Sequence, residues 1–296
     1  MLPFARGEVT VTALLKNGLI LAASVALAIS SNASALAGAC AHLPAPTSDP
    51  RFAAVTALQI ELCHSRVDGA KVPEAKIVHV ARGSAFDVEF GVWTFDLARV
   101  RLEIVAAASP GGETAPSFKL RSGALFAING GYFDFGPKHE LRPAGLFLDN
   151  GRIKNPLGHA LSGTFLIAGR RVELKATSAV GKLAGYTFGL QSKPLLVDPG
   201  NKLGMRSDDG LPLPRSAVCM PDAKHVSFFY AGKGGLSLFE LATLLQAPID
   251  AGGFACDIAL NLDGGPSTQV AAAVDSAPFE RLGQNVANAI VVLPLR

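Results

Sequence analysis

The sequence predicts a single strand-rich α/β (α+β) domain with a mixed sheet and a few flanking helices. Short apolar runs bounded by Gly, Asn or Pro recur along the chain, which is the pattern of buried and half-buried strands. The clearest helical pattern lies between two such runs, so the order from about 216 to 263 resembles a strand–helix–strand crossover unit. Apolar residues make up 49% of the 296 residues, which allows a sizeable core.

The first half of the chain contains a series of apolar runs. They predict strands at 76–80, 86–90, 100–107 and 124–129. The Gly- and Pro-containing segment 109–117 is expected to be an exposed loop. Residues 41–50 are rich in Pro and small polar residues, so ordered structure is expected to begin near Phe52.

Two hairpins are predicted in the middle of the chain. The runs 144–149 and 152–154 flank Asn150-Gly151, a pair that supplies the positive φ values of a type I′ turn. The runs 164–168 and 171–175 repeat this arrangement around Gly169-Arg170.

A helix is predicted to start at Ser237, because Ser237 and Glu240 have the spacing of a capping box. Leu238, Leu241 and Leu245 then fall on one face, and Pro248 ends the helix. An apolar run leads from there to Asp263, and the last predicted strand covers 289–295.

The N-terminal segment has the features of a signal peptide. Residues 18–30 are apolar, follow a region with Arg6 and Lys16, and are too few for a membrane span. Cleavage is expected after Ala35 or Ala39, with an uncleaved anchor or a lipidated Cys40 as alternatives. We therefore divide the chain into a signal peptide (1–39), a lead-in (40–75) and the main domain (76–296). A secreted or periplasmic protein without a stable membrane anchor is expected.

The charge of the chain argues against a nucleic-acid partner. The formal net charge is +3, and one of these charges belongs to the predicted signal peptide. A nucleic-acid-binding domain would carry a much larger basic excess.

Four cysteines are present, and an oxidising compartment favours their pairing. We favour bridges between Cys40 and Cys63 and between Cys219 and Cys256, because the second pair borders predicted central strands whose ends can be adjacent. The two other connectivities and four free thiols remain open.

Two segments share one local pattern, in which an apolar run is followed by Asn or Asp and two glycines. They are residues 127–134, with Asn129 and Asp134, and residues 259–268, with Asp263. Glycine pairs beyond a strand end permit positive φ and close approach of backbone amides to a ligand. Two such ends that converge would suit a polar, anionic, oxygen-rich ligand. Two ordinary tight turns are the alternative.

Several ordered motifs together resemble those of the phosphodiester glycosidase family. The resemblance runs from about Phe86 to Pro294, and the order and spacing of its segments make it specific. These segments are Phe126–Asp134, Pro143–Leu146, Gln191–Val197, Pro214–Val218, the helix at Ser237, Leu260–Thr268 and Ala287–Ile290. The resemblance implies an enzyme that hydrolyses the bond between the anomeric carbon of a sugar and a phosphodiester oxygen. Its substrate would be a carbohydrate phosphodiester.

The motifs also nominate the site residues. Arg215 is the candidate for holding the leaving phosphate, because its planar guanidinium matches phosphate oxygens. Asp263 is the candidate nucleophile or general base at the anomeric carbon, and Asp134 is the second carboxylate. Sugar hydroxyls or phosphate oxygens would be held by Asn129, Gly130, Gly131, Gln191, Gly264, Gly265, Ser267 and Thr268.

Three points stay open at the level of sequence. No cofactor is firmly implied, although Ca²⁺ or Mg²⁺ between Asp134, Asp263 and phosphate oxygens would suit hard oxygen ligands. His139 and His159 lie close to motif segments and are lower-ranked candidates for acids or phosphate ligands. A non-catalytic exported protein that binds a glycan or envelope polymer in the same pocket is the alternative function.

Overall fold

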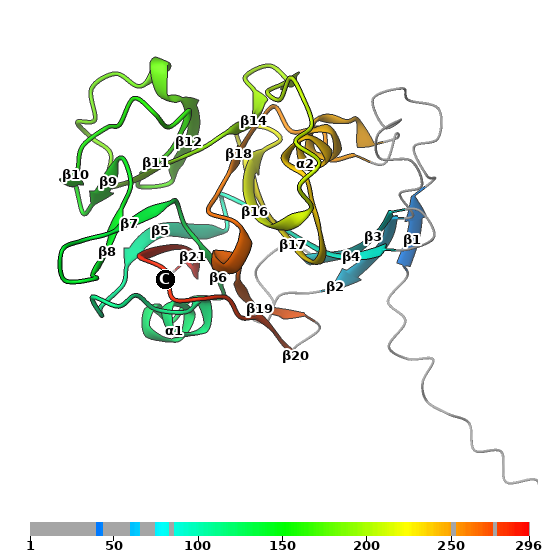
Figure 1. Ribbon diagram of the computed structural model, residues 1–296, viewed down its shortest axis with the longest axis horizontal. Coiled ribbons are helices and arrows are strands. Elements are labelled where there is room, and N and C mark those ends of the chain that lie inside the picture. The colour runs from blue at the N-terminus through cyan, green and yellow to red at the C-terminus, as the bar shows by residue number, and fades with distance from the viewer. Residues whose placement is uncertain are drawn as a thin grey trace, which may run out of the picture. The chain divides into compact units, whose positions relative to one another are not determined.

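The computed structural model describes residues 40–43, 60–65, 75–82, 86–249, 253–274 and 277–295, and side chains over 88–249, 253–272 and 278–295. The predicted signal peptide lies outside these residues. Within them, three larger sheets, one two-stranded sheet and two α-helices form the fold (Figure 1), which confirms the strand-rich α+β class. The described helices are too short or too polar to cross a membrane.

The largest sheet has nine strands, and its neighbouring strands all pair in the antiparallel sense. Its order is β1 (Cys40–Leu43), β2 (Ile60–Ser65), β3 (Ala75–Arg82), β4 (Phe86–Asp96), β17 (His225–Leu236), β16 (Leu213–Met220), β18 (Ile258–Asn261), β14 (Leu195–Asp198) and β15 (Lys202–Leu203).

The predicted crossover is present, but it skips one strand. Strands β17 and β18 run in the same direction on either side of β16, and helix α2 (Leu238–Gln246) connects them. Because β16 and β17 are joined as a hairpin, the other edge of β16 is open to β18, which pairs with it in the antiparallel sense. The expected mixed sheet is therefore replaced, in the described part of the chain, by antiparallel pairings.

Two five-stranded sheets and one hairpin complete the described fold. One sheet has the order β10 (Arg152–Asn155), β9 (Phe147–Asp149), β13 (Phe188–Ser192), β11 (Gly163–Ala168) and β12 (Arg171–Ala176). The other has the order β20 (Ala277–Arg281), β19 (Val270–Val274), β6 (Phe126–Asn129), β21 (Asn288–Pro294) and β5 (Val100–Ala106). The hairpin pairs β7 (Phe133–Phe135) with β8 (Leu141–Pro143).

The predicted hairpins and the predicted helix are confirmed. Strands β9 and β10 flank Asn150-Gly151, and both turn residues have positive φ. Strands β11 and β12 pair around residues 169–170. Ser237 caps α2, since its hydroxyl accepts from the Glu240 amide while the Glu240 carboxylate accepts from the Ser237 amide.

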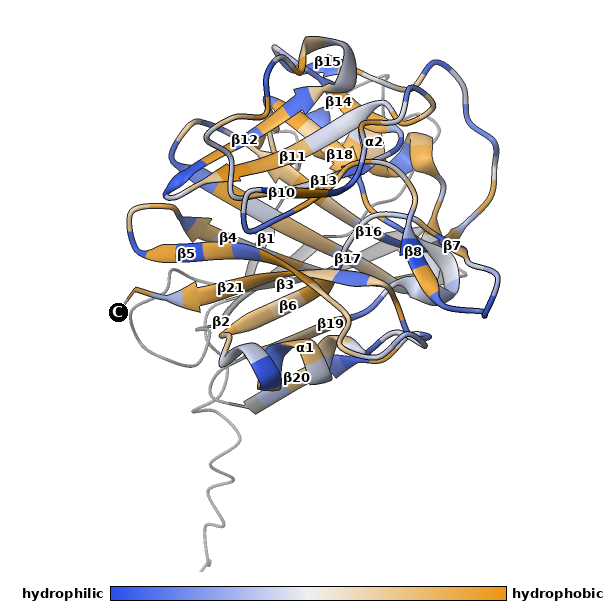
Figure 2. Cartoon of the chain, turned by 90° about the vertical axis from the view of Figure 1, so that its left-hand side faces the viewer, coloured by the Kyte–Doolittle hydropathy of each residue, from blue (hydrophilic) through white to orange (hydrophobic). Residues whose placement is uncertain are grey.

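The segment 109–117 differs from its prediction, because helix α1 (Ala115–Ser122) begins inside it. Pro116 is compatible with a helix start, since the first turn does not need its missing N–H. Ala115 and Phe118 are fully buried beside residues of β6 and β21. Figure 2 shows hydrophobic colour along β6 and β21 and hydrophilic residues on α1. Tertiary burial of two residues, rather than a strong local pattern, therefore selects this helix.

Aromatic side chains join the three larger sheets. Phe126 of β6, Phe228 of β17 and Phe165 of β11 are fully buried in one cluster, and the rings of Phe126 and Phe228 stack with centroids 5.3 Å apart. Phe229 points to the other face of the nine-stranded sheet, as alternation along a strand requires, and packs in the cluster that contains α2. The nine-stranded sheet is thus buried on both faces near its middle.

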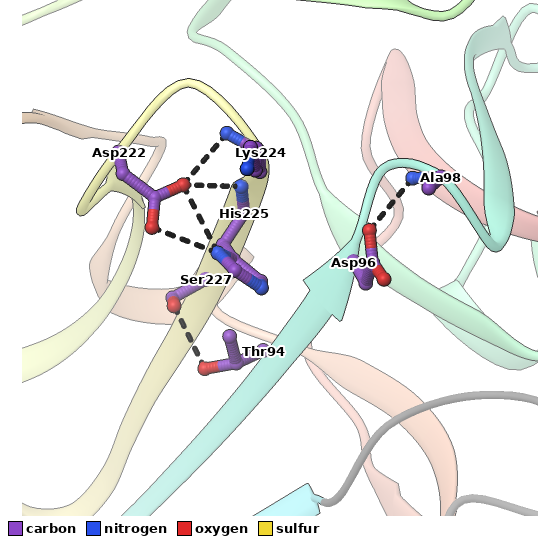
Figure 3. A network of polar contacts seen from close by, with 7 residues as sticks. All are labelled: Thr94, Asp96, Ala98, Asp222, Lys224, His225 and Ser227. Carbon is purple, nitrogen blue, oxygen red and sulfur yellow. Dashed lines mark hydrogen bonds and ion pairs between the residues drawn. The ribbon is translucent and has the colours of Figure 1, made fainter.

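The turn between β16 and β17 is closed by Asp222 (Figure 3). Its carboxylate accepts hydrogen bonds from the backbone amides of Lys224 and His225 at 2.6 and 2.9 Å, and contacts His225 Nδ1. Farther along β17, Ser227 shares a hydroxyl hydrogen bond of 2.8 Å with Thr94 of the neighbouring strand β4. The Asp222 contacts thus close the turn, and the Ser227–Thr94 contact joins the hairpin to β4.

The predicted bridge between Cys219 and Cys256 is present and links β16 to the segment that leads into β18. Cys40 and Cys63 lie opposite each other in the register of β1 and β2. Their side chains fall outside the described residues, so that bridge stays a prediction.

The Cys219–Cys256 bridge provides a test of stability. Replacing both residues with Ala should lower the free energy of unfolding by about 2–5 kcal/mol, because the open chain gains entropy in the unfolded state. Urea denaturation of the variant and of the oxidised wild type measures the difference. Equal stability of the two proteins would contradict a stabilising role for the bridge.

Candidate active site

Asn129 lies at the end of β6 and is fully buried. Its Nδ2 donates to the carbonyl oxygens of Asp263 and Gly130 at 2.8 and 3.3 Å. Its Oδ1 accepts from the Ser216 hydroxyl at 2.7 Å and from the backbone amide of Gln269 at 3.1 Å. These four bonds use the whole capacity of the side-chain amide. Asn129 therefore joins β6, β16 and the segment after β18, and has no free polar atom for a ligand.

The first glycine pair also serves the packing of the site. The amides of Gly130 and Gly131 donate to the carbonyl oxygen and the Oδ1 of Asn288 at 3.0 and 3.1 Å. A Cβ at Gly130 would lie 1.9 Å from Asn288 Oδ1, and one at Gly131 would lie 2.4 Å from the Gln191 carbonyl oxygen. Close backbone approach therefore requires glycine at both positions, and their N–H groups are occupied within the protein.

Asp263 follows β18 and is held by both neighbouring segments. Its amide donates to the Gly130 carbonyl oxygen at 3.0 Å, so the two strand ends meet as the paired motifs predict. Its carboxylate accepts from the Gly264 amide at 3.0 Å and from the Ser267 hydroxyl. Burial raises the pKa of the Asp263 carboxyl despite these hydrogen bonds.

Arg215 extends from β16 and is 7% exposed. Its Nε donates to the Leu236 carbonyl oxygen at 3.1 Å, and its Nη2 donates to that of Leu211 at 3.2 Å. A Cβ on Gly264 would lie 3.6 Å from Arg215 Nη1, so the residue next to Asp263 packs directly against the guanidinium. Burial lowers the pKa of Arg215. A desolvated cation and a desolvated carboxylate thus occupy the same region.

Tyr132 joins this region, although the sequence did not single it out. Its hydroxyl accepts a hydrogen bond of 3.1 Å from Nδ2 of the buried Asn261. Burial and the charge of Asp263 raise the pKa of Tyr132, while Arg215 opposes that shift. The signal for Tyr132 is its place directly after the Gly130-Gly131 pair, where a strand end already delivers polar groups.

A pocket of about 450 Å³ adjoins Tyr132. The polar and ring-bearing side chains on its wall are Tyr132, Phe133, Asp134, Asn155, His159 and Lys193. Gln191 lies behind this wall, where its Oε1 accepts from the Leu146 and Gly158 amides at 2.8 and 2.7 Å. Asp134 and His159 thus face the pocket, whereas Gln191 shapes it.

The other site residues predicted from the sequence include three in the segment after Asp263, namely Gly265, Ser267 and Thr268, and one in a distant turn, His139. Ser267 Oγ accepts from Gln284 Nε2 at 3.0 Å, and Gly265 has a φ of 58°, which favours glycine. Thr268 Oγ1 is buried without a hydrogen-bond partner among the described residues. His139 is exposed in the β7–β8 turn and does not line the pocket.

The described residues do not form a recognisable metal site. Among them, no three His, Cys, Asp or Glu side chains gather where they could share an ion. The side chains that the structure places beside Asp263 are a hydroxyl, a phenol and a guanidinium, those of Ser267, Tyr132 and Arg215, rather than further carboxylates. This donor set does not fit the oxygen-rich shells of Ca²⁺ or Mg²⁺.

The chain resembles known proteins in its family and in its fold. The profile of the phosphodiester glycosidase family matches residues 122–293. No curated protein matches the chain.

Three solved structures share the fold. A hypothetical protein from Synechocystis has a TM-score of 0.55 and 16% identity, with 81% of this chain and 64% of that chain covered. The zebrafish N-acetylglucosamine-1-phosphodiester alpha-N-acetylglucosaminidase catalytic domain, auto-inhibited by its pro-peptide, has a TM-score of 0.56 and 14% identity, with coverage of 88% and 97%. A protein from Burkholderia pseudomallei described as exported has a TM-score of 0.51 and 13% identity, with coverage of 71% and 74%.

The role of Asn129 predicts a large loss of stability in Asn129→Ala. The change leaves the Gln269 backbone amide, the Ser216 hydroxyl and the Asp263 carbonyl oxygen without this partner, so unfolding should become easier by about 3 kcal/mol or more. Ser216→Ala, which removes only one of the four bonds, should cost about 1 kcal/mol. Denaturant unfolding measures both, and equal small effects would show that Asn129 does not hold the junction.

The raised pKa of Asp263 predicts how its stability cost varies with pH. Below pH 3.8, its ordinary value, the carboxyl is protonated in both the folded and the unfolded state and costs nothing. As the pH rises towards the higher folded-state pKa, the folded protein binds more protons than the unfolded chain, so the wild type loses stability. Asp263→Asn lacks this loss and should be the more stable protein at pH 7.

Thermal unfolding of Asp263→Asn and the wild type between pH 3 and pH 7 tests this expectation. The exposed Asp208→Asn change reports the general effect of removing one negative charge. The prediction would be contradicted if the two proteins unfolded at the same temperature at pH 7. It would also be contradicted if the difference in their unfolding temperatures were larger at pH 3 than at pH 7.

Proposed function

The chain belongs to the phosphodiester glycosidase family, and we propose that it hydrolyses the glycosidic bond of a sugar-1-phosphodiester. The products are the free sugar and a phosphate monoester. The observation that carries the proposal is that a desolvated carboxylate, Asp263, and a desolvated guanidinium, Arg215, both act on the pKa of Tyr132, while Gly264 beside Asp263 packs against the guanidinium. Groups with perturbed pKa values that gather in this way are typical of catalytic sites.

Arg215 acts on the leaving group. The bond from the anomeric carbon to oxygen breaks, and the oxygen leaves with the phosphate and keeps the electron pair. Phosphate is already a good leaving group, so cation pairing replaces part of the work of a general acid. Two of the nitrogens of Arg215 are held by carbonyl oxygens, while Nη1 lies towards Gly264 and the Asp263 segment. The guanidinium is therefore oriented before substrate binds, which favours the transition state.

Asp263 acts at the anomeric carbon, where its negative charge stabilises the oxocarbenium-like transition state. Water supplies the hydroxyl group that ends on the sugar. Burial makes the Asp263 carboxylate more basic than an exposed one, which suits a group that attacks or removes a proton at this carbon. The backbone of Asp263 is hydrogen-bonded to Asn129 and Gly130, which fixes the point from which its side chain extends.

The pocket beside Tyr132 is the proposed sugar subsite. It combines aromatic and aliphatic side chains with the carboxylate of Asp134 and the side chains of Asn155 and His159. Apolar surface suits the C–H face of a sugar, and the polar groups suit its hydroxyls. Asp134 enters the mechanism from this pocket as the second carboxylate, and Ser267 and Gly264 support Asp263 from the other side.

The protein is proposed to work outside the cytoplasm. A disulfide between Cys219 and Cys256 favours an oxidising compartment, and one structural relative is described as exported. The signal-peptide pattern of residues 18–30 supports the same compartment.

A hydrolysis assay on sugar-1-phosphodiesters tests the proposal, with N-acetylglucosamine-1-phosphodiesters first because the zebrafish relative is named for them. Arg215→Ala should slow hydrolysis of the phosphodiester by on the order of a hundredfold, and should affect an aryl glycoside of the same sugar much less. Asp263→Asn should slow both substrates alike, because both pass through the same transition state.

The exposed Arg99→Ala change is the matched control for loss of an arginine. Equal losses on both substrates in a folded Arg215→Ala protein would exclude a phosphate-specific role for Arg215. A protein that binds the phosphodiester, never turns it over, and binds equally well as Asp263→Asn would instead be a glycan- or polymer-binding protein.

A further inference from the structure

The Tyr132 side chain lies where the two site segments run side by side. One contact joins them through the backbone, from the Asp263 amide to the Gly130 carbonyl oxygen at 3.0 Å. A second contact joins Tyr132, two residues after Gly130, to Asn261, two residues before Asp263. In it, Asn261 Nδ2 donates to the Tyr132 hydroxyl at 3.1 Å. These two contacts hold the phenol beside Asp263, and the electrostatic influence of Asp263 and Arg215 on Tyr132 reflects that placement.

The hydrogen-bond pattern leaves the Tyr132 proton available. Asn261 donates from Nδ2 to two oxygens, the Tyr132 hydroxyl and the Lys193 carbonyl at 2.9 Å. The Tyr132 oxygen accepts in this contact and donates to no residue in the described part of the chain, so its own hydrogen is available to a bound ligand. Burial, followed by the Asp263 charge, raises the pKa of Tyr132, so the group is a neutral phenol that donates.

Tyr132 also belongs to the pocket, whose wall its side chain shares with Asp134 and His159. Asp263 and Arg215 do not line that pocket. A molecule that extends from the pocket to Arg215 therefore meets Tyr132 between the two. In a sugar phosphodiester, the group next to the sugar is the phosphate.

We propose that Tyr132 is a catalytic residue whose hydroxyl donates a hydrogen bond to a phosphate oxygen of the bound sugar phosphodiester. The inference rests on the proposed function, because it takes Arg215 as the partner of the same phosphate. When the bond from the anomeric carbon to oxygen breaks, the electron pair goes to the phosphate oxygen, and the donor stabilises that charge. The proton stays on the Tyr132 oxygen, so no further reactant is needed.

Tyr132→Phe tests the role of the hydroxyl, because it keeps the ring that walls the pocket. Hydrolysis of the sugar phosphodiester should fall by on the order of a hundredfold in kcat/KM, as expected for loss of one donor to developing charge. An aryl glycoside of the same sugar should change by less than about threefold, because it has no phosphate to receive the bond. Tyr186→Phe, which removes a hydroxyl that donates to Glu173 outside the site, is the matched control and should change neither rate.

Equal losses on both substrates would overturn the proposal, since a hydroxyl that only supports Asn261 would affect both in the same way. Binding supplies a readout that does not depend on turnover. In an Asp263→Asn background, Tyr132→Phe should weaken calorimetric binding of the sugar phosphodiester by about tenfold, the effect of roughly one hydrogen bond to a charged group. Unchanged affinity would also overturn the proposal.

The two proposals can fail separately. If the wild type binds the sugar phosphodiester without hydrolysing it, the hydrolytic function fails, while the binding comparison still decides the role of Tyr132. If the wild type hydrolyses the phosphodiester and Tyr132→Phe retains full rate and affinity, only the inference about Tyr132 fails. Both proposals would be overturned by a wild type that does not bind a sugar phosphodiester, does not hydrolyse one, and does not bind inorganic phosphate.

Discussion

The buried amide of Asn129 is the constraint on which the candidate site depends. It holds the carbonyl oxygen of Asp263, the hydroxyl of Ser216 and the amide of Gln269, so segments from separate sheets meet at one side chain. No other residue type offers two donors and two acceptors in a planar group of this size, except the longer Gln. The position of Asp263 relative to β16, and therefore to Arg215, follows from these bonds.

The sequence motifs predicted that the two strand ends meet, as they do in the structure, but some of the polar groups assigned to a ligand bond within the protein instead. Glycine pairs indicated close backbone approach, and the structure contains it, but at Gly130 and Gly131 the approaching group is Asn288 or Gln191 rather than a ligand. Sequence cannot separate these cases, because both require the same absence of a Cβ. Tyr132 was not predicted as a site residue for a related reason: its surroundings depend on Asn261, Asp263 and Arg215, which are distant in the chain.

The fold shows the same division between local and long-range information. The β9–β10 turn and the start of α2 were predictable, because Asn150-Gly151 and the Ser237 capping box act within a few residues. The sheet order was not, because the place of β18 beside β16 depends on which edge the β16–β17 hairpin leaves open. Helix α1 was missed because its stability comes from the burial of Ala115 and Phe118 under other elements. Local patterns therefore predicted elements, and tertiary contacts decided their partners.

The candidate site also concentrates groups that weaken the fold. Burial disfavours the charges of Asp263 and Arg215, and Asn261 Oδ1 and Thr268 Oγ1 are buried without partners among the described residues. Such groups cost free energy, and a fold retains them where other contacts over-determine the backbone. Here Asn129, Asn288 and Gln191 supply those contacts through amide groups whose hydrogen bonds stay within the protein. The arrangement separates two tasks: neutral amides hold the backbone, and the ionisable side chains between them keep capacity for a ligand. A substrate phosphate would then meet donors and charges that need no reorganisation, which is the physical basis of a preorganised site.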